Sequence, residues 1–428
     1  MSRQPALTTP PAVIPIQDAK YITEVRIYKV ITALYGGGVE PAQADPITVV
    51  RATEIRGHLR FWWRACRAAG YPDVQTLKKR EGEIWGSTEQ PSQVMVYCDI
   101  VNSDSIQQEI AYTVVRNEKN GKPKLQESSK LPKYATFPLQ PDKTKINQIG
   151  WKSDPVLLNV NFKLQLIYPK TMEADIKAAL WAWETFGGIG ARTRRGFGAL
   201  QWINSAESTP LTAEEVKQWI QKHLKNPEYV ATGEGNPAVP KLNPAMTIKV
   251  IANTASVESS WRYLIDKLNQ FRQARFGRQY GLSQWPEANA IRKLNGQGIK
   301  SAKTLSGPSP TPVNVSKYPR AAFGLPIIFH LPHDRLDDHS LEAVGHDRLA
   351  SPLILRPLVF QSEQSGKAVS LIVGLAAILD APRIPSGGLE LKGKTKTPVL
   401  SDLSSAETKQ ILPLKGNSDV LQAFLNTL

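Results

Sequence analysis

The chain has 428 residues, of which 41% are hydrophobic and 21% are charged, a composition that allows packed cores and excludes a broadly disordered protein. Lysines and arginines outnumber aspartates and glutamates by 53 to 38, and the formal net charge of +15 is spread over both halves, so a polyanion is the first partner to consider, although a protein can be basic without one. The chain has two cysteines, Cys66 and Cys98, which excludes a disulfide framework and a four-cysteine zinc site. We see no signal peptide and no apolar run of membrane length, so we expect a cytoplasmic protein without a membrane partner.

The first half predicts a ferredoxin-like module behind an N-terminal arm. Prolines break residues 1–19, which we expect to be a disordered arm. Alternating polar and apolar residues predict four strands, at residues 21–34, 94–100, 156–168 and 197–203. Helical spacing predicts helices at residues 53–69, with Thr53 as N-cap, and at residues 173–186, ended by Gly187. A long exposed excursion rich in Lys, Pro, Asn and Gly fills residues 117–153. The order is strand, helix, two strands, helix, strand, which predicts a ferredoxin-like (RRM-like) domain over residues 20–205.

The second half predicts a linker and a more heavily inserted domain. Residues 206–245 form the linker, with one helix opened by a capping box of Thr212 and Glu215. Residues 246–428 then mix strands with an amphipathic helix, and the apolar run from Ala368 to Leu379 is interpreted as a strand that runs into a helix. The expected fold class is α+β, with two ferredoxin-like domains that carry large loop insertions.

Four arginines share one face of the helix predicted at residues 53–69. They are Arg56, Arg60, Arg64 and Arg67. At 100° per residue they form a stripe beside an apolar stripe, and the helix places no acidic residue among them. Such a row is explained by contact with a phosphate backbone, which arginine binds bidentately. The alternative is a salt-bridged face whose acidic partners come from other elements.

Residues 187–198 hold five glycines and three arginines. The candidate binding residues are Gly188, Gly190, Arg192, Arg194, Arg195 and Gly196. Glycines allow close approach of a backbone to a ligand, and arginines add positive charge at the same place. The segment follows a helix and opens a strand, unlike a Rossmann fingerprint or a P-loop, so no nucleotide cofactor is expected. A purely structural turn is the alternative.

These motifs, in this order, resemble the RAMP superfamily, the repeat-associated RNA-binding proteins of CRISPR systems. Residues 53–64, TEIRGHLRFWWR, look like the first helix of the first RAMP subunit of the type III-B (Cmr) module. In the second half, PRAAFGLP at residues 319–326 and DRLASPL at residues 347–353 are similar to that family. Further matches are Phe271-Arg272-Gln273, Gly277-Arg278, Trp285-Pro286-Glu287 and Ile291-Arg292. The resemblance covers roughly residues 20–205 and 245–380.

The resemblance implies a non-catalytic RNA-binding subunit of a cytoplasmic antiviral ribonucleoprotein. Its partners would be CRISPR RNA, single-stranded target RNA near the 3′ end of the guide, and other Cmr-type subunits. The family's loop and first-helix motifs correspond to the glycine-rich segment and to Arg56, Arg60 and Arg64. As an extension, Arg272, Arg278, Trp285 and Arg292 are candidate RNA contacts, although Trp285 fits a core position better than a stacking platform.

Two other functions stay open at this stage. A metal-independent endoribonuclease that processes CRISPR RNA would need histidines as acid and base. Four histidines fall within residues 330–346 among aspartates, but their spacing fits no metal motif, so no catalytic residue, metal or cofactor is expected. A protein-only scaffold would meet acidic neighbours through its basic faces and would not bind RNA.

Overall fold

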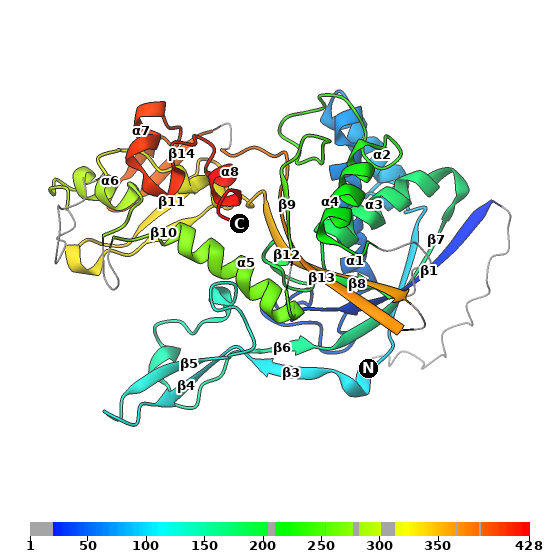
Figure 1. Ribbon diagram of the computed structural model, residues 1–428, viewed down its shortest axis with the longest axis horizontal. Helices are drawn as coiled ribbons and strands as arrows, with labels where there is room; N and C mark the ends of the chain where they lie inside the picture. Colours follow the sequence, from blue (N-terminus) through cyan, green and yellow to red (C-terminus); the bar gives the residue numbers. More distant parts are fainter. Residues whose placement is uncertain are drawn as a thin grey trace, which may run out of the picture.

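The structure is a computed structural model that describes residues 20–203, 210–252, 254–276, 282–300, 313–364, 367–384 and 387–428. The arm expected at residues 1–19 lies outside these ranges. Within them the chain is a mixed α/β protein whose sheets are antiparallel (Figure 1). None of the helices in these ranges has the length and apolar composition needed to cross a membrane.

The first half contains a four-stranded sheet in the order β2-β7-β1-β8. Its strands are β1 (Tyr21–Val30), β2 (Met95–Ile100), β7 (Val160–Pro169) and β8 (Leu200–Trp202). Along the chain these are the first, second, third and fourth strands of the sheet, so the spatial order is second, third, first, fourth. That is the order of a ferredoxin-like βαββαβ unit. Strands of this sheet that follow one another in the chain are joined by helices or by a long insertion.

The helices of this half pack on one another through apolar residues at helical spacing. They are α1 (Ala52–Arg67), α2 (Val74–Trp85) and α3 (Glu173–Phe186). Helix α1 buries Ile55, Leu59 and Trp62 in the same core as the inward residues of β1 and β7. Gly187 caps α3 as predicted, whereas α1 begins one residue before the expected N-cap and has no side-chain cap. The sequence did not predict α2.

Two small strand pairs lie in and around the excursion expected at residues 117–153, and their buried residues belong to a core shared with the second half. The strands are β3 (Gln107–Ile110) with β6 (Pro155–Leu158), and β4 (Tyr112–Arg116) with β5 (Pro123–Glu127). The β4–β5 pair lies toward the lower left of Figure 1, away from the main sheet. Asn159, with a φ of 57°, separates β6 from β7, so the single strand expected at residues 156–168 is two strands.

The second half contains two sheets. Helix α4 (Ala213–Lys225) precedes it, with its N-terminal amide bonded to Thr212. The first sheet has the order β12-β13-β9, from β9 (Ile248–Ile251), β12 (Leu353–Gln364) and β13 (Lys367–Ile378), with α5 (Val257–Arg272) packed against it. The second sheet has the order β10-β11-β14-β15, from β10 (Ile327–Phe329), β11 (His339–Ala343), β14 (Leu389–Lys392) and β15 (Lys396–Val399). Three short helices complete this half: α6 (Glu287–Leu294), α7 (Ser405–Gln410) and α8 (Val420–Leu425).

Two expectations for the second half need correction. The apolar run to Leu379 does not turn into a helix: β13 pairs with β12 over its whole length, because the ladder satisfies its backbone groups. The βαββ order of β9, α5, β12 and β13 matches the start of a ferredoxin-like unit, but this sheet has no fourth strand in the described part of the chain. Where a loop insertion was expected, the chain forms a separate sheet from β10, β11, β14 and β15.

The two halves share a core. Leu358, Val373 and Leu375 of the second half pack with the α3 residues of the first half. Arg356 of β12 is fully buried and donates to the carbonyls of Gly187 and Leu200, at 2.5 and 2.9 Å. Burial lowers the pKa of this guanidinium to about 9. The glycine-rich segment after α3 is therefore fixed against β12.

Candidate nucleic-acid interface

The arginine stripe of α1 is compensated by a carboxylate from another helix. Glu81 of α2, whose side chain is 2% exposed, forms ion pairs with Arg60 and, at 2.6 Å, with Arg64. The expected uncompensated row is therefore wrong for these two arginines, and the salt-bridged alternative holds. Both keep a third or more of their side-chain surface exposed, at 41% and 34%. Arg56 has no ion-pair partner among the described residues, and its Nε is buried without a hydrogen bond.

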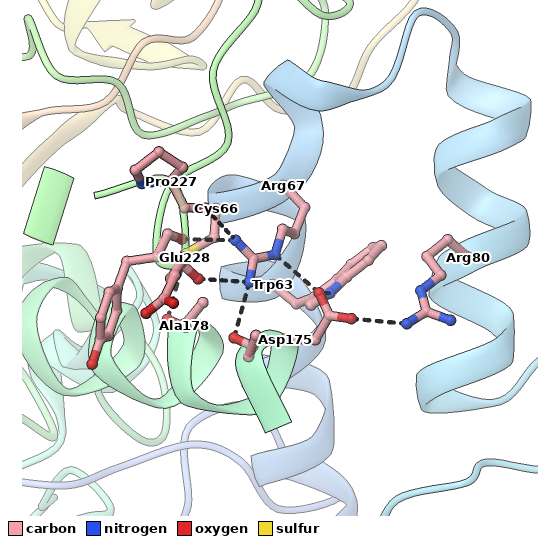
Figure 2. Close-up of polar contacts among 10 residues, drawn as sticks. Trp63, Cys66, Arg67, Arg80, Asp175, Ala178, Pro227 and Glu228 are labelled. Carbon is pink, nitrogen blue, oxygen red and sulfur yellow. Dashed lines mark hydrogen bonds and ion pairs between the residues drawn. The ribbon is translucent and has the colours of Figure 1, made fainter. Parts of the chain in front are cut away.

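Arg67 at the end of the stripe is bonded within the protein, and the expectation that it contacts RNA stays a prediction. Its Nε lies 2.9 Å from Asp175 of α3, and its terminal nitrogens donate to the carbonyls of Ala174 and Glu228 (Figure 2). Burial would raise the pKa of Asp175, but hydrogen bonds from Arg67, Trp63 and Arg80 hold that pKa below its usual value. This network ties α1 and α2 to α3 and to the segment after α4.

The glycines of residues 187–198 make room for the protein itself. A Cβ on Gly190 would lie 2.5 Å from the Tyr35 carbonyl, and one on Gly188 would lie 2.7 Å from the Gly198 carbonyl. Gly196, with a φ of 83°, would place a Cβ 2.5 Å from Nε1 of Trp261. These close approaches are made by backbone and core side chains. Gly188, Gly190 and Gly196 thus have a packing role, and the expectation that they admit an RNA backbone stays a prediction.

Two of the three arginines in this segment bond to the second half. Arg194 donates to the Ser351 carbonyl at 2.5 Å, and Arg195 donates to the Leu353 carbonyl at 2.7 Å. Burial lowers the pKa of Arg194 to about 10 and that of Arg195 to about 9. Neither has a carboxylate partner in the described ranges. Arg192 is half-buried in the left-handed region, with a φ of 54°.

Five arginines gather where this segment meets the end of α5 and the turn at residues 319–323. We call them the interdomain arginine cluster: Arg192, Arg194, Arg195, Arg272 and Arg320. Burial lowers the pKa of Arg195, and the charges of Arg272 and Arg192 lower it further. Arg272 lies over the rings of Phe323 and Tyr134, at 5.2 and 5.8 Å. Such proximity of like charges is costly unless an anion compensates it.

One carboxylate pairs with the cluster within the described part of the chain. Glu287, which is fully buried, lies 3.1 Å from Nε of Arg320. The Nε atoms of Arg192, Arg272 and Arg320 are buried without a hydrogen bond, so Arg320 and Glu287 form an ion pair without hydrogen-bond geometry. Five cations and one anion therefore leave an excess of positive charge at the junction of the two halves. This is the arrangement that the helix stripe was expected to provide.

A basic cavity of about 710 Å³ adjoins the cluster. Arg272 and Arg320 line it together with Arg275 and Lys300. The sequence reasoning missed these last two residues and Arg320, although Arg320 lies in the PRAAFGLP motif. The sequence did offer a signal for Arg320, because PRAAFGLP is one of the segments that resemble the RAMP superfamily.

The other predicted RNA-binding residues of the second half lie in different surroundings. Arg292 is 6% exposed and donates to Asp334 at 2.8 Å and to Asn289 at 2.7 Å, so its charge is neutralised inside the protein. Its expected RNA role stays a prediction. Trp285 is 1% exposed and donates to the Phe271 carbonyl, as a core residue does. Arg278 lies outside the described residues.

The histidine-rich stretch at residues 330–346 does not form a cluster of potential metal ligands. Across the described ranges, His, Cys, Asp and Glu side chains nowhere gather in threes suited to a metal ion. Nδ1 of His330 lies 2.5 Å from Asp338, and His339 bonds to the Asp337 carbonyl and to Asn295. These contacts order the loop before β11.

The strand order of the first half, with a glycine-rich segment between its last helix and last strand, places it in the ferredoxin-like class. Residues 27–201 match the model of the RAMP superfamily. The resemblance found in the sequence motifs is thereby confirmed. No curated protein matches the chain.

Solved structures of CRISPR subunits are also similar to the chain. Cmr1 from Pyrococcus furiosus, in its apo form, is 17% identical, with 85% of this chain and 89% of that chain covered and a TM-score of 0.47. A chain of the type III-B Cmr-beta complex bound to cognate target RNA is 13% identical, with coverage of 86% and 97% and a TM-score of 0.42. A chain of the same complex with target RNA, AMPPnP and single-stranded DNA is 13% identical, with coverage of 94% and 98% and a TM-score of 0.44.

Proposed function

We propose that the chain is a non-catalytic RNA-binding subunit of a type III-B CRISPR ribonucleoprotein. It engages guide and target RNA near the 3′ end of the guide and contacts other Cmr-type subunits. The interdomain arginine cluster is the observation that carries this proposal. The match of residues 27–201 to the RAMP superfamily and the motifs of the second half support the assignment to a CRISPR complex, and the net charge of +15 supports a polyanionic partner.

The cluster has the chemistry of a phosphate site. The carbonyls and rings that contact the cluster solvate its guanidinium groups but do not neutralise their charge, so the cluster is costly without an anion. A phosphate that reaches Arg192 and Arg272 would accept hydrogen bonds from both and would supply the missing negative charge. Tyr134 and Phe323, which lie beside Arg272, would pack against a sugar or base.

The test is a salt-dependent RNA-binding titration of the full chain and a double variant, Arg192→Gln with Arg272→Gln. Glutamine removes the charge while keeping a polar side chain, and it adds no new backbone strain at position 192, where arginine already has a positive φ. If each arginine contacts one phosphate, the affinity for labelled single-stranded RNA falls for every sequence. The slope of log K against log salt becomes shallower by about one for each lost contact.

Arg80→Gln is the matched control. Arg80 is a half-exposed arginine of α2 that pairs with Glu83 and Asp175, so its substitution removes one positive charge, half of what the double variant removes, from a site outside the cluster. We expect its salt slope to equal that of the wild type. Equal affinities and slopes for the wild type and the double variant would refute the proposal and favour the scaffold function.

The absence of catalysis is a separate part of the proposal. Incubation of the pure chain with labelled repeat RNA is expected to leave the RNA intact. Defined cleavage products that disappear on substitution of His330 or His339 by alanine would instead establish the ribonuclease alternative.

A further inference from the structure

The basic cavity beside the interdomain arginine cluster has a wall of two kinds. One part carries five cations of the second half: Arg272, Arg275, Arg292, Lys300 and Arg320. The other part is apolar and is formed in and after β10 by Ile327, Ile328, Phe329 and Leu331. The volume of about 710 Å³ falls within the range of about 300–1,000 Å³ that ligand sites occupy. Cations beside apolar side chains fit a nucleotide, which joins a phosphate to a sugar and a base.

Two carboxylates of the protein neutralise part of the cationic wall. Asp334, whose side chain is 2% exposed, lies 2.8 Å from Arg292 and also pairs with Lys300. Glu287, which is fully buried, lies 3.1 Å from Nε of Arg320. Because Arg292 is itself buried, a ligand reaches the exposed or half-buried cations of the wall, which are Arg272, Arg275, Lys300 and Arg320.

The charge left in the wall exceeds what a single internal phosphate supplies. With Arg275 left out of the count, four lining cations face Asp334 and Glu287 in the described part of the chain, so the excess is two positive charges. An internal phosphodiester of RNA carries one negative charge, whereas a phosphate monoester at a chain end carries about −1.5 to −2 at pH 7. A terminal phosphate therefore balances this wall.

Hydrogen bonds hold the segments around the cavity in place. Nη1 of Arg320 donates to the Arg272 carbonyl at 2.9 Å, and Nε2 of Gln297 donates to the Asp334 carbonyl at 3.0 Å. A wall that is fixed in advance lowers the cost of ordering side chains when a ligand binds. A chain end also needs a single entry, because the strand continues on only one side of it.

We propose that the basic cavity binds the terminal phosphate of an RNA chain. Arg275 and Lys300 donate to this phosphate, and the last sugar and base pack against Ile328, whose side chain is 67% exposed. The inference rests on the function proposed above, because the strand enters from the phosphate held by Arg192 and Arg272. Two RNA ends carry this chemistry, a 3′-phosphate of the guide and a 5′-phosphate of the target, and antiparallel pairing brings these two ends to the same place.

The first experiment compares three labelled single-stranded RNAs of one sequence, with a 3′-phosphate, with a 5′-phosphate and with neither. Each is titrated against the full chain at several salt concentrations. We expect one phosphorylated RNA to bind about tenfold more tightly than the unphosphorylated RNA, the lower end of what one hydrogen bond to a charged group contributes. The other should bind like the unphosphorylated RNA. A preference for the 3′-phosphate supports the guide as the source, a preference for the 5′-phosphate supports the target, and equal binding of all three RNAs would overturn the proposal.

The double variant Arg275→Gln with Lys300→Gln locates the phosphate. Both side chains are exposed, and Asp334 keeps Arg292 as its partner, so we expect a melting temperature close to that of the wild type. The variant should lose the preference for the phosphorylated end. Lys78→Gln with Lys79→Gln removes the same two charges from exposed positions of α2 and is the matched control, which should keep the preference. A preference that survives in the cavity variant, or that both phosphorylated ends share equally, would show a general charge effect and overturn the assignment.

The same titrations separate this inference from the proposed function. Arg192→Gln with Arg272→Gln should weaken the binding of all three RNAs, because the strand phosphate loses its partners. If the wild type binds RNA in a way that depends on Arg192 and Arg272 but ignores the end phosphates, the cavity inference fails alone. If the wild type and this variant bind all three RNAs equally, the proposed function fails as well.

Discussion

Glu81 is the residue on which the arginine stripe of α1 depends, and Glu81→Gln tests whether that stripe is structural. The carboxylate is almost fully buried and accepts from both Arg60 and Arg64. Glutamine keeps the shape but removes the charge, and it turns one acceptor oxygen into a donor that faces a guanidinium. We expect the variant to fold with reduced stability and to bind RNA with unchanged affinity.

The magnitude follows from the exposure of the two arginines. Breaking a fully buried ion pair costs about 3–5 kcal/mol, and an exposed pair is worth about 0–1 kcal/mol. Here the acid is buried and the bases are more than a third exposed, so water takes over part of their solvation. An intermediate loss of about 2 kcal/mol is expected, which lowers the melting temperature by about 4–8 °C for a domain of this size.

The assay pairs thermal unfolding with the RNA titration described above. If Arg60 and Arg64 served the RNA directly, removal of the competing carboxylate would free them, and the affinity for RNA would rise with a steeper salt slope. An unchanged melting temperature, or tighter RNA binding, would refute the structural reading of the stripe.

Three further predictions follow from other buried groups. The partners of Asp175 hold its pKa below the usual value, so this carboxylate stabilises the fold above its unfolded pKa of about 3.9. That stabilisation is lost as the pH falls through the folded pKa. Asp175→Asn should therefore lower the melting temperature at pH 7 and weaken the decrease of melting temperature with falling pH below about pH 4. Gly196→Ala should cost about 2–4 kcal/mol in urea unfolding, because a side chain there combines a positive φ with a clash against Trp261; a loss below 1 kcal/mol would contradict the packing role. Burial raises the thiol pKa of Cys66 and of Cys98 to about 12, so both should react slowly with a thiol reagent at pH 8 until the chain is unfolded, and fast labelling of Cys66 in the native chain would contradict its burial.

The sequence predicted the elements whose periodicity is long and regular. Helix α3 has the predicted bounds, and α1, β1 and β2 lie within a few residues of theirs, because one face of each is apolar over several turns or alternations. Helix α2 was missed because its apolar positions, Leu77, Ile84 and Trp85, are few among charged residues. The run to Leu379 was ambiguous because uniformly apolar residues fit a buried strand and a buried helix equally well.

The candidate site was harder to predict because the partners of each arginine are distant in sequence. Glu81 follows Arg60 by 21 residues, and Asp175 follows Arg67 by 108. The stripe of like charges on one helix therefore indicated that anions lie next to it. It did not show whether they are carboxylates of the protein or phosphates of a ligand. The motif residues of the second half showed the same limit: Arg292 pairs with Asp334 in the core, whereas Arg272 lies near Arg195 of the glycine-rich segment and Arg320 donates to the Arg272 carbonyl.

The geometry of the cluster divides its arginines by role. Arg194 and Arg195 donate to carbonyls at the start of β12, so their substitution would disturb the junction between the halves as well as any RNA contact. Arg192 and Arg272 have no hydrogen-bond acceptor or ion-pair partner for their side chains among the described residues, so they are the members whose charge a phosphate would compensate. A variant of Arg192 with Arg194 would therefore confound folding with binding. Because Arg192 and Arg272 come from different halves, a phosphate held by both would also connect the two halves across their shared core.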